Sequence, residues 1–230
     1  MEFNIEKYHL KSSSLFDFLS ADQTRFVKSK SIRKEYMKGD FLFREKSYSR
    51  GVYIVRKGKV KIFQTNTEGK QTIVYIYKKG DFFGYRPLLA NEPHPVAAVA
   101  MDNVVISFVP QEVFLNVLDK SSILARKLLV NLTKEFSVWI DKMTIFSQYG
   151  VKKRVALSLL ILNRVYQKDD NDKTVSISIN RDDFAGFVGT AKETLVRMLR
   201  IFKDEKIIVS KGTKIMILKP KVLINMIDEL

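Results

Sequence analysis

The chain has 230 residues, a formal net charge of +15 and a hydrophobic content of 46%. It contains no cysteine, which excludes disulfides, iron–sulfur clusters, thiolate zinc sites and cysteine catalysis. The basic excess is spread along the chain and favours a nucleic acid partner over a membrane, because no basic amphipathic anchor or lipidation signal is present. A surface kept basic for solubility is the alternative.

The start of the chain gives no sign of insertion into a membrane. The segment "MEFNIEKYHLKSSSLF" has no apolar signal core, and no run of about 18 apolar residues occurs anywhere. We therefore expect a cytoplasmic protein.

Residues 12–109 predict a helix followed by a sheet. Helical spacing of apolar positions within residues 12–30 is seen at Leu15, Phe16, Leu19 and Phe26. From about residue 32 the hydrophobic period changes to two, as in "GVYIVRKGKVKIFQT", and glycines recur about every ten residues. Many short strands with regular glycine turns predict a barrel, jelly roll or sandwich.

From Gln111 onward the pattern is helical, and one stretch has a coiled-coil period. Apolar residues step by three and four at Leu129, Leu132, Phe136, Trp139, Met143 and Phe146. This seam predicts a long helix that pairs with its twin. The alternative is a core helix packed on the sheet, which Ile123, Leu128 and Ile140 support. A helix that serves both surfaces explains more. Gly150 marks a break before a second helix, which ends in an acidic loop at residues 168–174.

Residues 180–217 predict two short helices, a tight turn and a β-hairpin. Asn180 is placed to cap the first helix, and Gly189 to make the turn. Thr190 is placed to cap the second helix, with Glu193 completing a capping box. The inward-facing positions of the second helix are Leu195, Met198, Leu199 and Phe202. Two strands joined by "SKGTK" complete a winged helix-turn-helix. The alternative, an amphipathic helical hairpin with a solvated charged face, leaves the tight turn and the wing unexplained.

The segment "VGTAKETLVRMLRIFKDEKII", followed by "KGTKIMIL", resembles the recognition segment of the cyclic-AMP receptor protein and fumarate–nitrate regulator family of bacterial transcription factors. The family motif runs roughly V-G-x-S-R-E-T-V-x-R-x-L, and this chain matches it at Val188, Gly189, Glu193, Thr194, Arg197 and Leu199. The resemblance covers nearly the whole chain. It implies an α+β fold with an N-terminal β-roll of the cyclic-nucleotide-binding, jelly-roll type over residues 1–120. A dimerisation helix over 121–147 and a C-terminal winged helix-turn-helix over 148–230 would follow.

The resemblance also implies which side chains meet double-stranded DNA. Lys192, Glu193 and Arg197 would face base edges, because lysine and arginine donate to guanine and glutamate accepts from cytosine. Phosphate contacts or helix positioning would come from Asn180, Arg181, Thr190, Thr194 and Lys211. Two departures, Lys192 where the family often has arginine and Ala191 where it has serine, leave the operator sequence open. A homodimer joined at the seam would read a near-palindromic operator with half-sites roughly 34 Å apart, with RNA polymerase as a further partner.

The effector site of that family implies a pocket lined by Gly84, Tyr85, Arg86, Pro95, Val96, Trp139 and Ile140. Cyclic-nucleotide binders have glutamate, arginine and serine at the positions of Tyr85, Pro95 and Val96. Because a buried phosphate without a cation is costly, we expect no response to cyclic AMP. Arg86 could anchor a different acidic effector, or could form a surface salt bridge. We expect no cofactor: an iron–sulfur cluster needs cysteines, and the only histidines available to a haem are His9 and His94.

Two classes of function remain from the sequence. We favour a DNA-binding transcription regulator; the alternative is a ligand-binding regulatory protein whose C-terminal helices contact protein rather than DNA. No nucleophile–base pair, metal-ligand cluster or Walker-type loop is visible, so we expect no enzyme. The sequence does not determine the operator, the effector, or whether the protein activates or represses transcription. An apolar seam at Trp139 and Ile140 could make the dimer constitutively active.

Overall fold

The computed structural model describes residues 4–9, 14–167 and 174–228, so most of the predicted acidic loop at 168–174 lies outside the described residues. The chain forms two compact units that divide inside helix α4 (Ser122–Gln148), between Glu135 and Phe136. We call them the N-terminal unit and the C-terminal unit. Residues 4–9 and 70–72 group with the C-terminal unit.

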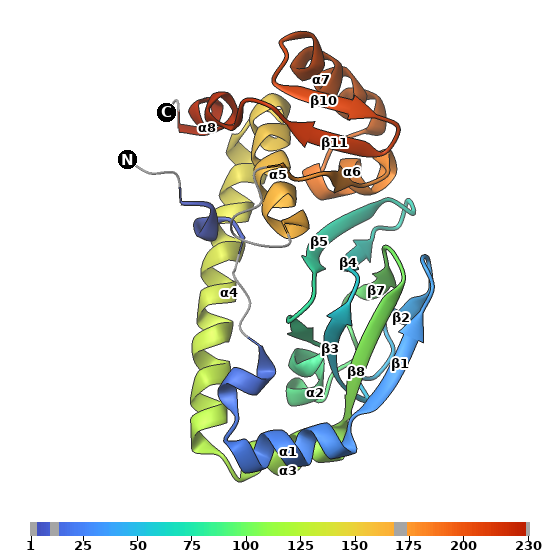
Figure 1. Ribbon diagram of the computed structural model, residues 1–230, viewed down its shortest axis with the longest axis vertical. Helices are drawn as coiled ribbons and strands as arrows, with labels where there is room; N and C mark the ends of the chain where they lie inside the picture. The colour runs from blue at the N-terminus through green and yellow to red at the C-terminus, as the bar shows by residue number, and fades with distance from the viewer. Residues whose placement is uncertain (1–3, 10–13, 168–173, 229–230) are drawn as a thin grey trace. The chain divides into compact units, whose positions relative to one another are not determined.

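Two four-stranded sheets form the β-roll of the N-terminal unit, in the orders β1-β8-β3-β6 and β2-β7-β4-β5 (Figure 1). The strands are β1 (Ile32–Tyr36), β2 (Phe41–Phe43), β3 (Gly51–Lys57), β4 (Val60–Thr65), β5 (Gln71–Tyr77), β6 (Phe82–Phe83), β7 (Ala97–Ala100) and β8 (Val104–Pro110). Strand β8 pairs antiparallel with both β1 and β3. Its alternate residues Val104, Ile106 and Phe108 are buried, as the period of two predicts. The predicted β-roll is confirmed.

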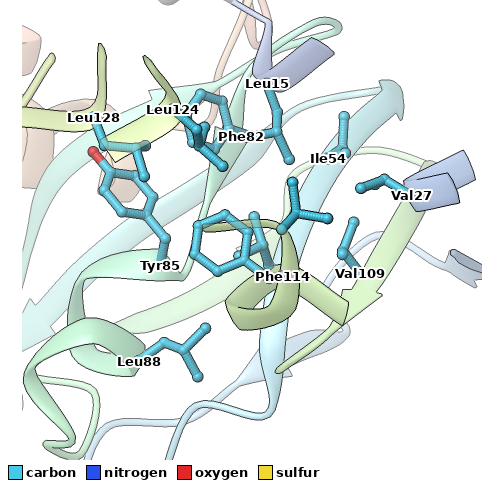
Figure 2. Close-up of a cluster of buried hydrophobic side chains, with 12 residues drawn as sticks. Leu15, Val27, Ile54, Phe82, Tyr85, Leu88, Val109, Phe114, Leu124 and Leu128 are labelled. Atoms are coloured by element: carbon cyan, nitrogen blue, oxygen red, sulfur yellow. The ribbon is translucent and has the colours of Figure 1, made fainter. Parts of the chain in front are cut away.

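Helices of the N-terminal unit cover part of the roll around one apolar cluster. They are a 3₁₀ helix (Leu15–Phe18), α1 (Ala21–Lys30), α2 (Tyr85–Ala90), α3 (Gln111–Asp119) and the first half of α4. Figure 2 shows the cluster, whose labelled members are Leu15, Val27, Ile54, Phe82, Tyr85, Leu88, Val109, Phe114, Leu124 and Leu128. The predicted helix within residues 12–30 is thus two helices, because Ser20 caps α1 through a capping box with Gln23. Its buried residue is Val27, and Phe26 is largely exposed.

The C-terminal unit carries the second half of α4 and the predicted winged helix-turn-helix, which is confirmed (Figure 1). A 3₁₀ helix (Ile5–Lys7) belongs to this unit, and Lys7 lies 4.0 Å from Asp141 of α4. The remaining elements are α5 (Val151–Tyr166), β9 (Ile177–Ser178), α6 (Arg181–Val188), α7 (Lys192–Asp204), β10 (Ile208–Lys211), β11 (Lys214–Ile217) and α8 (Pro220–Asp228). The three strands form one sheet in the order β10-β11-β9. Among the described helices, none is both long and apolar enough to cross a membrane.

Helix α4 has two faces with a period of three and four residues. Its inner face is buried at Leu124, Leu128, Val138 and Ile145, and polar residues interrupt this series. Its outer face is a stripe of large apolar side chains, exposed by 37–67%, at Ile123, Leu129, Val130, Phe136, Trp139, Ile140, Met143 and Phe146. Of the predicted seam, only Leu132 packs against the apolar cluster of the N-terminal unit. The packing of α4 on the core is therefore confirmed, and the pairing of its exposed face with a second chain stays a prediction.

Candidate nucleic-acid interface and effector pocket

Asn180 begins the helix-turn-helix as predicted. Its Oδ1 accepts a hydrogen bond of 2.7 Å from the backbone N–H of Asp183, and its Nδ2 donates to the Asp183 carboxylate at 2.8 Å. Asp182 and Asp183 lie in the first turn of α6, where negative charge complements the helix dipole. The helix is anchored from inside by Phe184 and Phe187, both buried.

The turn between α6 and α7 depends on Gly189, whose φ of +70° lies in the left-handed region. A Cβ at this position would stand 2.7 Å from the Phe146 ring, so glycine is also needed for space. Arg154 of α5 donates to the Gly189 carbonyl oxygen at 3.1 Å and lies 5.8 Å over the same ring. The turn is thus packed against the end of α4 and the start of α5.

The predicted cap of α7 is wrong. Thr190 is buried at the turn, with its backbone N–H donating to Ala185 O at 3.0 Å. Ala191 takes the extended backbone of the N-cap position and makes no side-chain cap. With Ala191 as N-cap, Glu193 becomes the second helical residue and cannot form a capping box, although its charge still suits the helix N-terminus. Helix α7 therefore begins one position later than the capping residue type predicts.

Replacing Gly189 with alanine is expected to destabilise the protein more than the same change at Gly212. Gly212 has a φ of +58° but open space around its Cβ position, so that variant carries only the backbone cost of about 1–2 kcal/mol. Gly189→Ala adds the clash with Phe146, which we expect to cost at least about 1 kcal/mol more. Urea unfolding of both variants measures the difference, and equal losses would contradict the close packing of the turn.

Helix α7 separates a buried face from a charged one. Leu195, Leu199 and Phe202 are buried, while Met198 is only half-buried. The side chains of Lys192, Glu193 and Arg197 are exposed together with that of Arg200. Val196, 46% exposed, lies among them. Its exposure is not predictable from the sequence, because an apolar residue at this position extends the buried pattern. An exposed apolar side chain on such a face can contact a thymine methyl group.

Two residues of the first turn of α6 contact the other elements of the motif. The carboxylate of Asp182 pairs with the Lys192 amine at 2.9 Å. The guanidinium of Arg181 donates to the carbonyl oxygen of Gly212 at the tip of the wing, at 3.0 Å, and burial lowers its pKa. Lys211 is exposed beside that tip, and Thr194 is half-buried on α7. The predicted DNA-contacting residues are thus brought together around the start of α6, the start of α7 and the wing.

In the N-terminal unit, Gly84 precedes α2 with a φ of +91°. A Cβ there would stand 3.0 Å from the Tyr53 ring and 3.1 Å from the carbonyl oxygen of Gly51, so strand β3 and the start of α2 approach closely. Tyr85 follows and is 2% exposed, whereas Arg86 is exposed. Pro95 is exposed, and Val96 is half-buried against the interior of the roll.

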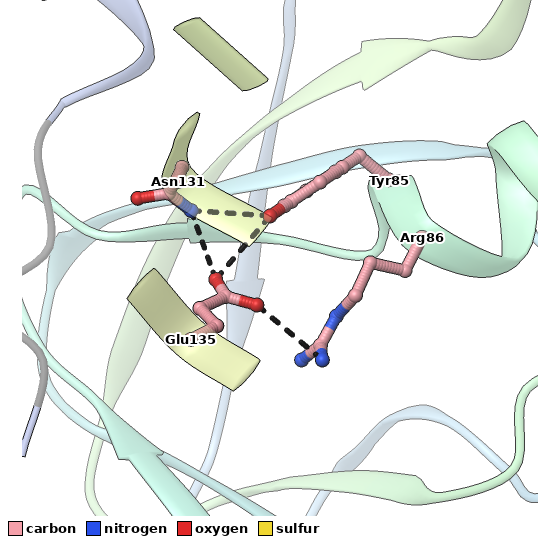
Figure 3. A network of polar contacts seen from close by, with 4 residues as sticks. All are labelled: Tyr85, Arg86, Asn131 and Glu135. Carbon is pink, nitrogen blue, oxygen red and sulfur yellow. Dashed lines mark hydrogen bonds and ion pairs between the residues drawn. The ribbon is translucent and has the colours of Figure 1, made fainter. Parts of the chain in front are cut away.

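Four polar side chains meet between α2 and α4 (Figure 3). The Glu135 Oε1 atom accepts hydrogen bonds from Asn131 Nδ2 at 2.9 Å and from the Tyr85 hydroxyl at 3.2 Å. Asn131 Nδ2 also donates to the Tyr85 hydroxyl at 3.2 Å. The other carboxylate oxygen of Glu135 lies 3.3 Å from Nη1 of Arg86. Of the two predicted roles for Arg86, the structure shows the salt bridge.

Asn131 and Glu135 are not among the residues that the sequence predicts for this pocket. They lie four residues apart on the inner face of α4, in the same series as Leu124 and Leu128, and a polar pair on a buried helix face was the available signal. The predicted α4 residues Trp139 and Ile140 belong to the C-terminal unit and stay a prediction for this pocket.

Aromatic rings fill the interior of the β-roll. Phe83 stacks on Tyr53 at 5.4 Å and on Tyr77 at 4.6 Å between ring centroids. Phe43 stacks on His94 at 3.7 Å. Burial lowers the pKa of His94 to about 4 and raises the pKa of Tyr53 to about 12, so both side chains are uncharged at neutral pH.

Two family models match the chain. The "Cyclic nucleotide-binding domain" matches residues 33–121, and the "Crp-like helix-turn-helix domain" matches residues 153–226. Together they cover the β-roll and the winged helix-turn-helix.

Curated relatives and solved structures are similar to this chain over most of its length. The chain is 24% identical to the fumarate and nitrate reduction regulatory protein of Vibrio cholerae, over 81% of this chain and 74% of the relative. It is 24% identical to the cyclic AMP receptor protein of Thermus thermophilus, over 86% of this chain and 89% of the relative. The structure of FixK2 from Bradyrhizobium japonicum superposes with a TM-score of 0.77 at 22% identity, covering 85% of this chain and 96% of that one.

Proposed function

We propose that the chain, which belongs to the cyclic-AMP receptor protein and fumarate–nitrate regulator family of DNA-binding transcription regulators, acts as a homodimer and reads a near-palindromic operator through α7. The observation that carries this proposal is the charged, exposed face of α7. On it, Lys192 and Arg197 would donate to guanine and Glu193 would accept from cytosine.

The elements around α7 would position it on the DNA backbone. Lys211 at the exposed wing tip would neutralise a phosphate, and Asn180 and Thr194 would support the phosphate contacts of the two helix N-termini. The burial of Thr190 and the hydrogen bond from Arg181 to Gly212 support a different role for these two residues. We propose that they hold the turn and the wing in place rather than contact phosphate directly.

The homodimer would form through the exposed stripe of α4. Its members Leu129, Phe136 and Met143 are seven residues apart and 65–67% exposed, which is the pattern of a coiled-coil seam that lacks its partner in a single chain. Two chains joined there would present their α7 helices to half-sites roughly 34 Å apart.

The same dimer is proposed to act without cyclic AMP. Pro95 and Val96 offer no charge to a cyclic phosphate, and Arg86 is already paired with Glu135. The aromatic rings of Tyr53, Phe83 and their neighbours occupy the interior of the roll. A different small-molecule effector stays open.

Further parts of the proposal follow from membership of the family. RNA polymerase would be a partner at the promoter, and the protein would work in the cytoplasm, where the operator lies. We assign no catalytic activity, because the curated relatives are transcription regulators. We also assign no haem or iron–sulfur group: the chain has no cysteine, and His94 is buried against Phe43.

Selection of binding sites from random duplexes with ligand-free protein tests the proposed function. We expect a palindromic consensus, and an affinity that falls roughly 10³–10⁵-fold between 50 and 200 mM salt if six to ten phosphates are contacted. Retention of no duplex, at low salt as well, would contradict DNA binding and favour protein contacts by the C-terminal helices. A consensus that emerges without effector would support the effector-independent form.

A further inference from the structure

Glu135 is a half-buried carboxylate whose two oxygen atoms face different partners. Its side chain is 17% exposed, and all three groups that contact it lie in the N-terminal unit. Asn131 and Tyr85 donate to Oε1, while Oε2 has no hydrogen bond among the described residues and stands opposite Arg86. Because a carboxylate removed from water is costly unless paired, Arg86 is the counter-charge that keeps Glu135 in place.

Arg86 is itself held from a second direction. Although burial acts to lower the pKa of Arg86, Tyr77 of β5, which is buried among the rings of the roll, and Glu135 both act to raise it. The ion pair joins α2 to the inner face of α4. The outer face of the same helix carries the apolar stripe, so the contact of Glu135 with Arg86 fixes the part of the N-terminal unit from which the dimer would be built.

We propose that Glu135 is a built-in anion: it occupies an anion site at Arg86 in place of a diffusible effector and holds α4 in the arrangement that binds DNA. The effect on DNA binding rests on the proposed function, whereas the anion site does not. A carboxylate fixed on the neighbouring helix acts at an effective concentration of millimolar or above, so free anions at lower concentration do not displace it. Removal of the Glu135 carboxylate should open the site to small carboxylates.

Chemical rescue with acetate tests the anion site. Glu135→Ala leaves Arg86 without its counter-charge and removes the acceptor for Asn131 and Tyr85, so we expect the melting temperature to fall by about 2–4 °C. Sodium acetate at 100 mM, compared with sodium chloride at equal ionic strength, should restore at least half of that loss. The wild type and Glu68→Ala, which truncates an exposed glutamate of the β4–β5 turn, should show no difference between the two salts.

Two further variants test whether rescue depends on the lost charge of Glu135, on the empty space left by its side chain, or on Arg86. Glu135→Gln fills the site with a neutral side chain of the same shape, so acetate should not rescue it. In the double variant Glu135→Ala with Arg86→Met, the cation is gone and acetate should again have no effect. Rescue of the double variant, or an equal acetate effect on wild type and Glu135→Ala, would overturn the anion site.

Operator affinity in the same buffers tests the consequence for DNA binding. Glu135→Ala and Glu135→Gln should bind the selected operator at least about tenfold more weakly than wild type, a loss of about 1.4 kcal/mol. Acetate should restore the affinity of the alanine variant alone. Wild-type affinity in both variants would overturn the role of Glu135 in holding α4, even where acetate binds. If the wild type itself fails to bind any duplex, the proposed function fails, and the melting temperatures still decide the anion site.

Discussion

An Arg197→Ala variant is expected to lose most of the discrimination between the operator and a random duplex, while its binding to random duplex stays sensitive to salt. The exposed guanidinium of Arg197 on α7 can make two parallel hydrogen bonds to one guanine. Such a contact is worth about 1–3 kcal/mol in each half-site, so a dimer should lose roughly 30-fold or more in specificity. Fluorescence anisotropy on both duplexes at two salt concentrations measures this.

Arg200→Ala is the matched control for this prediction. Arg200 is exposed on the same helix and lies 4.0 Å from Asp204, so its loss removes the same charge without the proposed base contact. It should weaken both duplexes by similar factors. If Arg197→Ala also weakens both duplexes equally, the assignment of Arg197 to base readout is wrong and the residue contributes only charge.

The helix-turn-helix was predictable because its signals are local. Asn180 caps α6 and Gly189 adopts the left-handed turn, as the residue types at these positions predict. The cap of α7 was not predictable from the same rules. Thr190 is a good capping residue by type, but the turn buries it and places Ala191 at the N-cap. Residue type alone does not decide between Thr190 and Ala191 at the N-cap, because burial of Thr190 in the folded turn is a property of the tertiary structure.

The pocket of the N-terminal unit was predictable only in part, because its partners are distant in the chain. Gly84, Tyr85 and Arg86 form the start of α2 as expected. The residues that contact Tyr85 from α4 are Asn131 and Glu135, 46 and 50 positions away, and no periodicity in the sequence marks these pairs. The coiled-coil spacing marks the apolar outer side of α4, whereas the carboxylate that pairs with Arg86 lies on its inner face. The family resemblance predicted effector contacts at Trp139 and Ile140, which lie further along the same helix.

The outer face of α4 supports the second large prediction: Phe136→Asp should make the protein monomeric and abolish tight operator binding. Phe136 is 66% exposed in the single chain, so its replacement removes little from the core of that chain. In a parallel pair of α4 helices it would face its twin, where two carboxylates at the seam repel each other in an apolar environment.

The loss of the dimer acts on DNA binding through valency. Two linked recognition helices bind with an avidity roughly 10²–10⁴ above that of one helix, so the operator affinity of Phe136→Asp should fall by about that factor. The unfolding midpoint of the monomeric variant should change little, because the side chain of Phe136 is largely outside the core of the single chain. Light scattering coupled to size exclusion gives the mass, and the anisotropy assay gives the affinity. Lys134→Glu, which adds an acid at an exposed position on the side of α4 opposite Phe136 and Met143, should remain dimeric. A dimeric Phe136→Asp protein with wild-type affinity would mean that the stripe is not the seam, and the exposed apolar face of α4 would then need another partner.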